Sequence, residues 1–203
     1  MREISAECAG PRGLYQRAIQ LTAPRMAKLR SFGSPSRNAP LRMTKGNLYY
    51  YFENKEDILY FCHDYSLGLI LELLAQIETS QKSPEEKLNE LIVAFVQMII
   101  DELNGVALTL DLQPLSPARL RKIIAKRDRF DRGIREILRA GMKSGKFREG
   151  DPKLLSFAIL GAVNWIARWY NPRGPAHSAE ISRTFADFLI AGLKTSTQIR
   201  ADN

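Results

Sequence analysis

Helical periodicity without strand-like alternation is the feature that most constrains this chain. From Asn54 to the C-terminal region, apolar residues recur three and four positions apart. This spacing gathers them on one face of a helix. No segment shows the sustained alternation of apolar and polar residues that predicts a half-buried strand. We therefore predict an all-α fold.

Capping and breaking residues divide this periodic region into separate helices. The predicted helices start at Asn54, Ser83, Gly105, Ser116, Asp151 and Ser178, and Ser83-Pro84-Glu85-Glu86 has the form of a capping box. Gly145 is expected to end the fourth helix in a left-handed conformation. We expect the inner faces of these helices to include Ile124 in the fourth and Phe188 in the last.

Cysteine content and hydrophobicity bear on the compartment. Two cysteines, Cys8 and Cys62, are too few for a disulfide framework and favour a reducing environment. No charged-then-apolar leader follows Met1, and the most apolar stretch, 154–167, is too short to span a bilayer. These features predict a cytoplasmic protein with no membrane partner.

Charge is unevenly distributed along the chain. Residues 1–45 contain nine basic and two acidic side chains, residues 46–118 three basic and twelve acidic, and residues 119–148 twelve basic and three acidic. Two basic blocks around an acidic one suggest two anion-binding surfaces. For the second basic block, a solvated helix face explains the charge equally well.

The segment from Met43 to Lys55 contains the most informative motif. Thr44 is suited to cap a short helix whose tip, Lys45, Gly46 and Asn47, offers hydrogen-bond donors and little bulk. A helix that enters the major groove needs such a tip, because its first turn reaches the base edges. Hydroxyls of Tyr49, Tyr50 and Tyr51, with the Lys55 ammonium, are suited to phosphate oxygens. A tyrosine-rich helix corner packed against a core is the alternative interpretation.

The sequence Thr44-Lys-Gly-Asn-Leu-Tyr-Tyr-Tyr-Phe-Glu-Asn-Lys-Glu-Asp-Ile-Leu59 resembles the signature of the TetR family of transcriptional repressors. The resemblance implies a DNA-binding helix-turn-helix region over residues 1–53 and a helical ligand-binding and dimerisation domain over residues 54–203. It implies that Lys45 and Asn47 face bases, and that Tyr49, Tyr51 and Lys55 hold the DNA backbone. It also implies a homodimer that binds a palindromic double-stranded operator and is released by a small-molecule inducer.

The last two helices are candidates for the dimer interface. The helix 154–170 is apolar nearly all round its N-terminal half, so it must be covered on two sides. A second copy of the same helices, 154–170 and 178–193, is the simplest second cover. A central helix of a monomer is the alternative.

Four polar or aromatic residues are candidates for ligand binding: Arg127, Asn164, Arg168 and Trp169. The arrangement around Asn164 is similar to the C-terminal domains of TetR repressors that respond to acyl-CoA thioesters, which implies an acyl-CoA inducer. Arg127 lies on the apolar side of its predicted helix, where it either points into a pocket or snorkels at its rim.

Sequence motifs for catalysis are absent. His63 and His177 are the two histidines, and neither has the partner spacing of a zinc site or a catalytic triad. There is no glycine-rich phosphate loop with a strand before it. We therefore predict no enzymatic activity, no metal and no cofactor. His63 is expected to be structural and His177 exposed.

The region before Met43 departs from the family pattern. A short helix is expected around Tyr15–Leu21, but residues 23–42 contain Pro24, Pro35 and Pro40 and no helical apolar stripe. Prolines inside a helix would prevent the usual supporting helix from forming. This departure gives the alternative of a dimeric ligand-binding protein with impaired DNA binding. Codon degeneracy lets residues 31–36 be encoded by bases that read Leu-Arg-Ile-Ala-Glu in a shifted frame, so two compensating frameshifts are our hypothesis for its origin.

Overall fold

The computed structural model describes residues 13–16, 18, 51–103 and 112–194. Its helices are α5 (Lys55–Thr79), α6 (Pro84–Gln97), the π-helical turn η1 (Met98–Glu102), α7 (Pro117–Lys143), α8 (Pro152–Trp169) and α9 (Ser178–Ala191). Residues 13–16 and 18 are also helical, and the described residues contain no strand. The all-α prediction is confirmed. The helix expected from Gly105 lies mostly outside the described residues.

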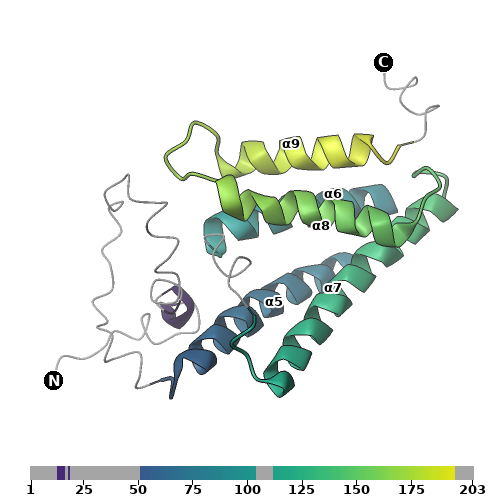
Figure 1. Cartoon of the computed structure of the whole chain (residues 1–203). Helices are drawn as coiled ribbons and strands as arrows, with labels where there is room; N and C mark the ends of the chain where they lie inside the picture. The colour runs from purple at the N-terminus through teal and green to yellow at the C-terminus, as the bar shows by residue number, and fades with distance from the viewer. Residues whose placement is uncertain (1–12, 17, 19–50, 104–111, 195–203) are drawn as a thin grey trace.

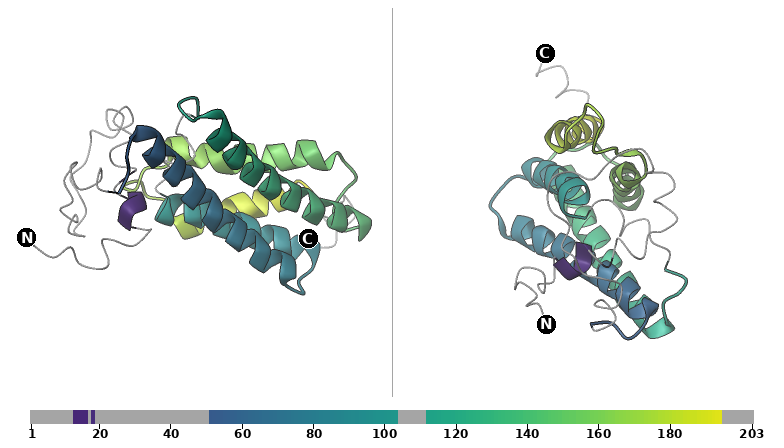
Figure 2. Two further views of the ribbon diagram at one scale, coloured as in Figure 1. Left: turned by 90° about the horizontal axis from the view of Figure 1, so that it is seen from below. Right: turned by 90° about the vertical axis from the view of Figure 1, so that its left-hand side faces the viewer.

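The helices pack around one main core (Figure 1). Helix α5 lies against α7 and α6, α9 lies against α6, and α8 lies against α7. Figure 2 shows the same bundle from below and from one end. Every described helix contributes fully buried side chains to this core. A smaller, separate cluster is formed by Leu59 and Leu67 of α5, Ile123 of α7, and Leu115 just before α7.

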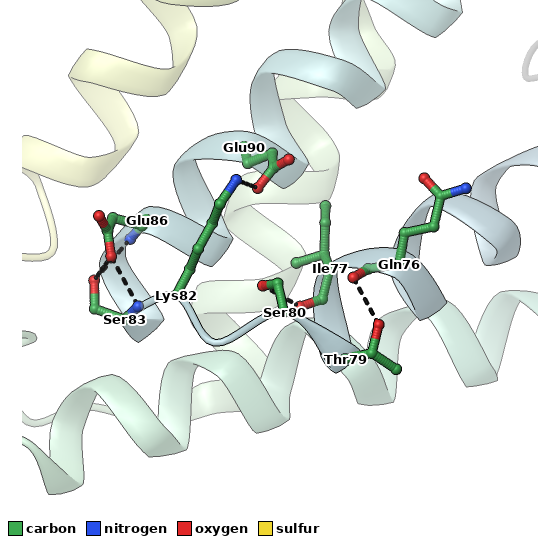
Figure 3. A network of polar contacts seen from close by, with 8 residues as sticks. All are labelled: Gln76, Ile77, Thr79, Ser80, Lys82, Ser83, Glu86 and Glu90. Atoms are coloured by element: carbon green, nitrogen blue, oxygen red, sulfur yellow. Dashed lines mark hydrogen bonds and ion pairs between the residues drawn. The ribbon is translucent and has the colours of Figure 1, made fainter.

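Local capping explains the sharp corner between α5 and α6 (Figure 3). The Ser80 hydroxyl donates to the Ile77 carbonyl at the end of α5, at 2.8 Å. At the start of α6, the Glu86 backbone N–H donates to the Ser83 hydroxyl, and the Glu86 carboxylate accepts from the Ser83 backbone N–H at 2.8 Å. The predicted capping box is confirmed, and the orphan backbone donors that begin a helix are satisfied.

Tyr15 attaches the N-terminal helical residues to this bundle. Its side chain is fully buried and stacks near Tyr65 of α5, with ring centroids 4.9 Å apart. The Ser66 hydroxyl donates to the Tyr15 oxygen at 3.0 Å, and burial raises the pKa of the phenol. Gln16 donates to the Glu102 carbonyl at 2.7 Å. The short helix expected around Tyr15 is confirmed for the residues that the structure describes.

Three details of the sequence prediction are wrong. Ser178 was expected to cap the last helix, but His177 is at the N-cap position, Ser178 is the first helical residue, and no side chain makes a capping bond. Phe188 is 78% exposed and Ile124 is 44% exposed, although both were expected on inner faces. Periodicity places a residue on an apolar stripe, but it does not say whether a neighbouring helix of the same chain covers the edge of that stripe.

Helix α5 is the one described helix that is long and apolar enough to cross a bilayer by length and composition. Its residues Ile70, Leu74 and Ile77 are almost fully buried inside the bundle. A core helix of a globular protein passes the same test, so this finding carries no membrane assignment.

The end of α7 requires glycine at two positions. Gly145 has a φ of 70°, and the Lys146 and Gly145 N–H groups donate to the carbonyls of Gly141 and Met142. This is the Schellman pattern, as the sequence predicted for this glycine. The turn folds the buried Phe147 ring back over Gly141, where a Cβ would lie 2.0 Å from the ring.

We therefore expect Gly141→Ala to destabilise the protein by about 1–3 kcal/mol, because the ring must move within a packed core. Gly68→Ala is the control, since no described atom lies within 4 Å of its Cβ position. That variant should be neutral or more stable by up to about 1 kcal/mol through helix propensity. Urea unfolding of both variants measures the difference, and equal stabilities would contradict the close approach.

Candidate functional site

The predicted DNA-binding segment ends at the start of α5. Tyr51 is 36% exposed, and Lys55 is an exposed first residue of that helix. Both side chains lie at the end of the bundle where the segment 44–50 joins it. The other predicted DNA contacts lie outside the described residues: Thr44, Lys45, Gly46, Asn47, Tyr49 and Tyr50.

A capping box fixes the junction between this segment and α5. The Asp57 N–H donates to Asn54 Oδ1 at 2.9 Å. In return, Asp57 Oδ2 accepts from the backbone N–H groups of Asn54 at 3.2 Å and Glu53 at 3.1 Å. The prediction of Asn54 as N-cap is confirmed. The backbone N–H groups just before α5 are therefore held by the Asp57 side chain in the first turn of that helix.

The same first turn is attached to the start of α7. The Ser116 N–H donates to Glu56 Oε1 at 2.9 Å, and Arg119 forms ion pairs with Asp57 and, at 3.5 Å, with Glu56. The Ser116 hydrogen bonds lower the pKa of Glu56, and the Arg119 guanidinium lowers the pKa of Asp57. These contacts hold the start of α5, and hence Lys55, relative to α7.

Further ion pairs follow the α5–α7 contact. Lys126 lies 2.6 Å from Asp64, and Arg129 makes a two-bonded contact with Glu78 at 2.5 and 3.0 Å. Exposed pairs of this kind contribute about 0–1 kcal/mol each, so they align the helices more than they stabilise them. Part of the second basic block, residues 119–148, thus neutralises carboxylates of the acidic block. From the sequence, only an anion-binding surface or a solvated helix face was expected for this block.

A buried histidine lies on the same helix pair. His63 is 2% exposed, and its Nε2 has no hydrogen-bond partner among the described residues. Burial, with the nearby Arg127 guanidinium, lowers the pKa of His63 to about 4. The imidazole is therefore neutral at pH 7, and its unpaired nitrogen costs about 1–3 kcal/mol in a dry core. Its burial agrees with the structural role expected for His63, and among the described residues its Nε2 has no partner.

Arg127 also lines a groove of about 560 Å³ between α7 and α8. The groove brings together basic, acidic and apolar side chains from both helices, namely Arg127, Asp128, Asp131, Arg132, Arg135, Lys153, Phe157 and Leu160. The sequence prediction named Arg127 among these and missed the others. Residues 128, 131, 132 and 135 are three and four positions apart, which places them along one stripe of a helix. This spacing is the sequence signal that could have identified them as a group.

The structure does not bring the other predicted ligand residues into this groove. Asn164, Arg168 and Trp169 are exposed on the outer surface of α8, and none of them lines the groove with Arg127. The Trp169 ring stacks near Phe185 of α9, with centroids 6.2 Å apart. These three side chains would meet a ligand only at the outer surface of the bundle.

That outer surface of α8 and α9 is unusually apolar. Leu154 and Trp165 are each 64% exposed, and Trp169 and Phe188 are also exposed. Between them lies Gly161, with no described atom within 4 Å of its Cβ position. A shallow apolar cavity of about 270 Å³ next to Phe188 lies between the two helices. Large apolar side chains grouped around a small residue are typical of a surface that another helix covers.

Within the described residues, no group of three histidine, cysteine or acidic side chains is placed to hold a metal ion.

Comparison with known proteins relates the chain to transcriptional regulators. Residues 81–193 match the family model described as "Tetracyclin repressor-like, C-terminal domain". The HTH-type transcriptional repressor KstR2 of Mycolicibacterium smegmatis is 25% identical over 154 residues, which cover 74% of this chain and 75% of the relative.

Two solved structures share the fold. The TetR family regulator PfmR of Thermus thermophilus is 29% identical, with a TM-score of 0.69, over 88% of this chain and 100% of that one. AibR, in a complex with isovaleryl coenzyme A and operator DNA, is 24% identical, with a TM-score of 0.66, over 89% and 98% of the two chains. Both likenesses extend well beyond the region that the family model matches.

The neutral His63 predicts a specific acid sensitivity. Its pKa is lower in the folded chain, at about 4, than the ordinary value of 6.5, so the unfolded chain binds the proton more readily. The stability contributed by this difference is complete above pH 6.5 and is lost as the pH falls toward 4. It amounts to something on the order of 3 kcal/mol.

His63→Leu should therefore lose less stability than the parent chain when the pH is lowered from 7.5 to 4.5. His177→Gln, which changes the exposed histidine, should keep the parent's pH profile. Denaturant titration across this range measures the effect. A His63→Leu variant with the parent's acid loss would show that the buried imidazole is not responsible.

Proposed function

Because the chain belongs to the TetR family of transcriptional regulators, we propose that it is a ligand-responsive repressor that binds a palindromic operator as a homodimer. The observation that carries this proposal is the position of the Thr44–Lys55 motif, which leads directly into the capped and ion-paired start of α5. DNA held by residues 44–55 would thereby be coupled to α7. We keep the proposed division into a DNA-binding region, 1–53, and a ligand-binding and dimerisation domain, 54–203.

The apolar surface of α8 and α9 supports the homodimer. A stable homodimer interface is large and has an apolar centre. Leu154, Trp165 and Phe188 supply apolar area, and Gly161 allows a second helix to come close. A second copy turned by a two-fold axis would cover the same residues in both chains, and the two DNA-binding ends would then match a palindromic site.

The inducer that we propose is an acyl-CoA thioester. AibR shares the fold of this chain, and its complex contains isovaleryl coenzyme A together with operator DNA. The α7–α8 groove offers cations together with the apolar side chains of Phe157 and Leu160. Arg127 is the candidate contact in that groove, and Asn164, Arg168 and Trp169 remain candidates at the outer surface of α8. We propose a non-enzymatic, cytoplasmic regulator that needs no cofactor.

Disrupting the proposed interface should give monomers. Phe188→Glu places a charge in the centre of the apolar surface, so sedimentation at micromolar concentration should change from about twice the 23.0 kDa chain mass to that mass itself. Ile124→Glu is the matched control, because it changes an exposed apolar residue near the start of α7. If both variants and the parent sediment alike, the interface lies elsewhere.

The proposed DNA contacts separate into two kinds. Lys55→Ala should weaken binding to all sequences and flatten the dependence of affinity on salt, because fewer counterions are released when one phosphate contact is lost. Asn47→Ala should instead relax preference at one base position, by about 1–3 kcal/mol. Fluorescence anisotropy with operator and scrambled duplexes measures both effects. Indistinguishable variants would contradict this assignment, and a parent chain that binds no duplex would favour the dimeric ligand-binding protein instead.

An acyl-CoA that binds the native state should raise the melting temperature with concentration. At one hundred times the dissociation constant the stabilisation is about 2.7 kcal/mol. A series of CoA thioesters of increasing chain length, with the matching free acids as controls, tests the class of ligand. The proposal fails if no thioester changes the melting temperature while a hydrophobic amine does.

A further inference from the structure

The groove between α7 and α8 concentrates positive charge at one place on the surface. Arg127, Arg132 and Arg135 of α7 and Lys153 of α8 line it, and its volume is about 560 Å³. The cations come from two helices and converge on one cavity, whereas a merely solvated helix face would spread them outward.

The carboxylates of the groove neutralise only part of this charge. Asp131 is engaged by Arg135 and by the Ser156 hydroxyl. Asp128 is the other acidic lining residue. Among the described residues, Arg127, Arg132 and Lys153 have no carboxylate within ion-pair distance. The groove therefore keeps an excess of positive charge.

The side of α7 that faces α5 behaves differently. Arg119, Lys126 and Arg129 each form an ion pair with a carboxylate of α5. The cations of α7 that face α5 are thus neutralised within the chain, whereas Arg127 and Arg132 of the groove have no such pair among the described residues. The unpaired cations of the groove are therefore available to a negatively charged group from outside the chain.

Two buried nitrogen atoms on or near groove-lining residues have no hydrogen-bond partner among the described residues. One is Nε of Arg135, whose other guanidinium nitrogen is paired with Asp131. The other is Nε2 of His63, which lies near the lining residue Arg127. Buried polar atoms without a partner are rare in native proteins, and an unfilled ligand site is one of the ordinary reasons for them.

An aromatic ring lies beside these cations. Phe157 is half exposed, with the Arg135 guanidinium 5.5 Å and the Lys153 ammonium 5.9 Å from its ring centre. An exposed ring of this kind provides a surface on which a nucleobase stacks. Cations within 6 Å of the ring centre are suited to phosphates attached to that base, and arginine pairs with phosphate through two hydrogen bonds.

We infer that this groove binds the phosphorylated nucleotide end of the inducer, with the adenine on Phe157 and the phosphates on Arg127, Arg132, Arg135 and Lys153. The inference rests on the proposed acyl-CoA inducer, whose coenzyme part carries an adenine and three phosphate groups. The ribose 3′-phosphate distinguishes this ligand from the common nucleotides.

Calorimetric titration of the full-length chain tests the inference. The ligands are one acyl-CoA that raises the melting temperature, its 3′-dephospho counterpart, adenosine 3′,5′-bisphosphate and ATP. Arg132→Ala combined with Lys153→Ala should weaken acyl-CoA binding at least tenfold and reduce its salt dependence. Arg121→Ala combined with Lys122→Ala removes the same charge from exposed positions of α7 outside the groove and should change affinity less than twofold. Phe157→Leu keeps an apolar side chain and should weaken binding through lost stacking.

The outcomes separate the groove from the inducer. If the acyl-CoA binds all variants equally well, the groove inference is wrong and the proposed inducer stands. If no acyl-CoA binds but adenosine 3′,5′-bisphosphate does, and only the groove variants lose it, the inducer is wrong and the groove stands as a nucleotide site. ATP binding as tight as that of the acyl-CoA would overturn the assignment to a 3′-phosphorylated ligand. Unchanged melting temperatures without ligand verify that the variants fold.

Discussion

The contact between α5 and α7 is the constraint on which the rest of the molecule depends. Both helices contribute buried side chains to the main core and to the separate Leu59 cluster. Gly133 lets the helices approach so closely that a Cβ there would lie 2.5 Å from the Leu74 side chain. Ion pairs from acidic α5 to basic α7 select this pairing from others that would bury similar apolar area. The first turn of α5, where DNA binding is proposed, therefore cannot turn independently of α7.

Much of this architecture follows from local sequence signals. Asn54, Ser83 and Gly145 mark helix ends that the structure reproduces, because capping bonds form within a few residues and need no tertiary context. The pairing of the two charge blocks was not predictable in this way, because it depends on which helices become neighbours. The groove was missed for the same reason: Lys153 and Phe157 become relevant only where α8 lies beside α7. Phe188 was misplaced because none of the described helices of its own chain covers it.

Helix α8 has three different surfaces, and each serves one proposed role. Val163 and Ile166 point into the core and are fully buried. Leu154 and Trp165 form part of the apolar surface proposed for dimerisation. Phe157 lies at the border between that surface and the α7–α8 groove, where it meets the cations of α7. A ligand in the groove would therefore touch α7, which holds α5, and would lie next to the surface proposed for dimerisation. In this arrangement, a shift of α7 on ligand binding would act directly on the start of α5, where DNA binding is proposed.

The central claim is that one dimer binds DNA through the start of α5 and releases it when an acyl-CoA binds. Footprinting of the intact chain on the DNA that flanks its own gene tests this claim most directly. The account predicts a protected stretch with two-fold sequence symmetry, which disappears when the acyl-CoA is added and the protein remains folded and dimeric. Protection that persists at saturating acyl-CoA would contradict release by this ligand. No protection at concentrations where the dimer is intact would contradict the claim of DNA binding itself.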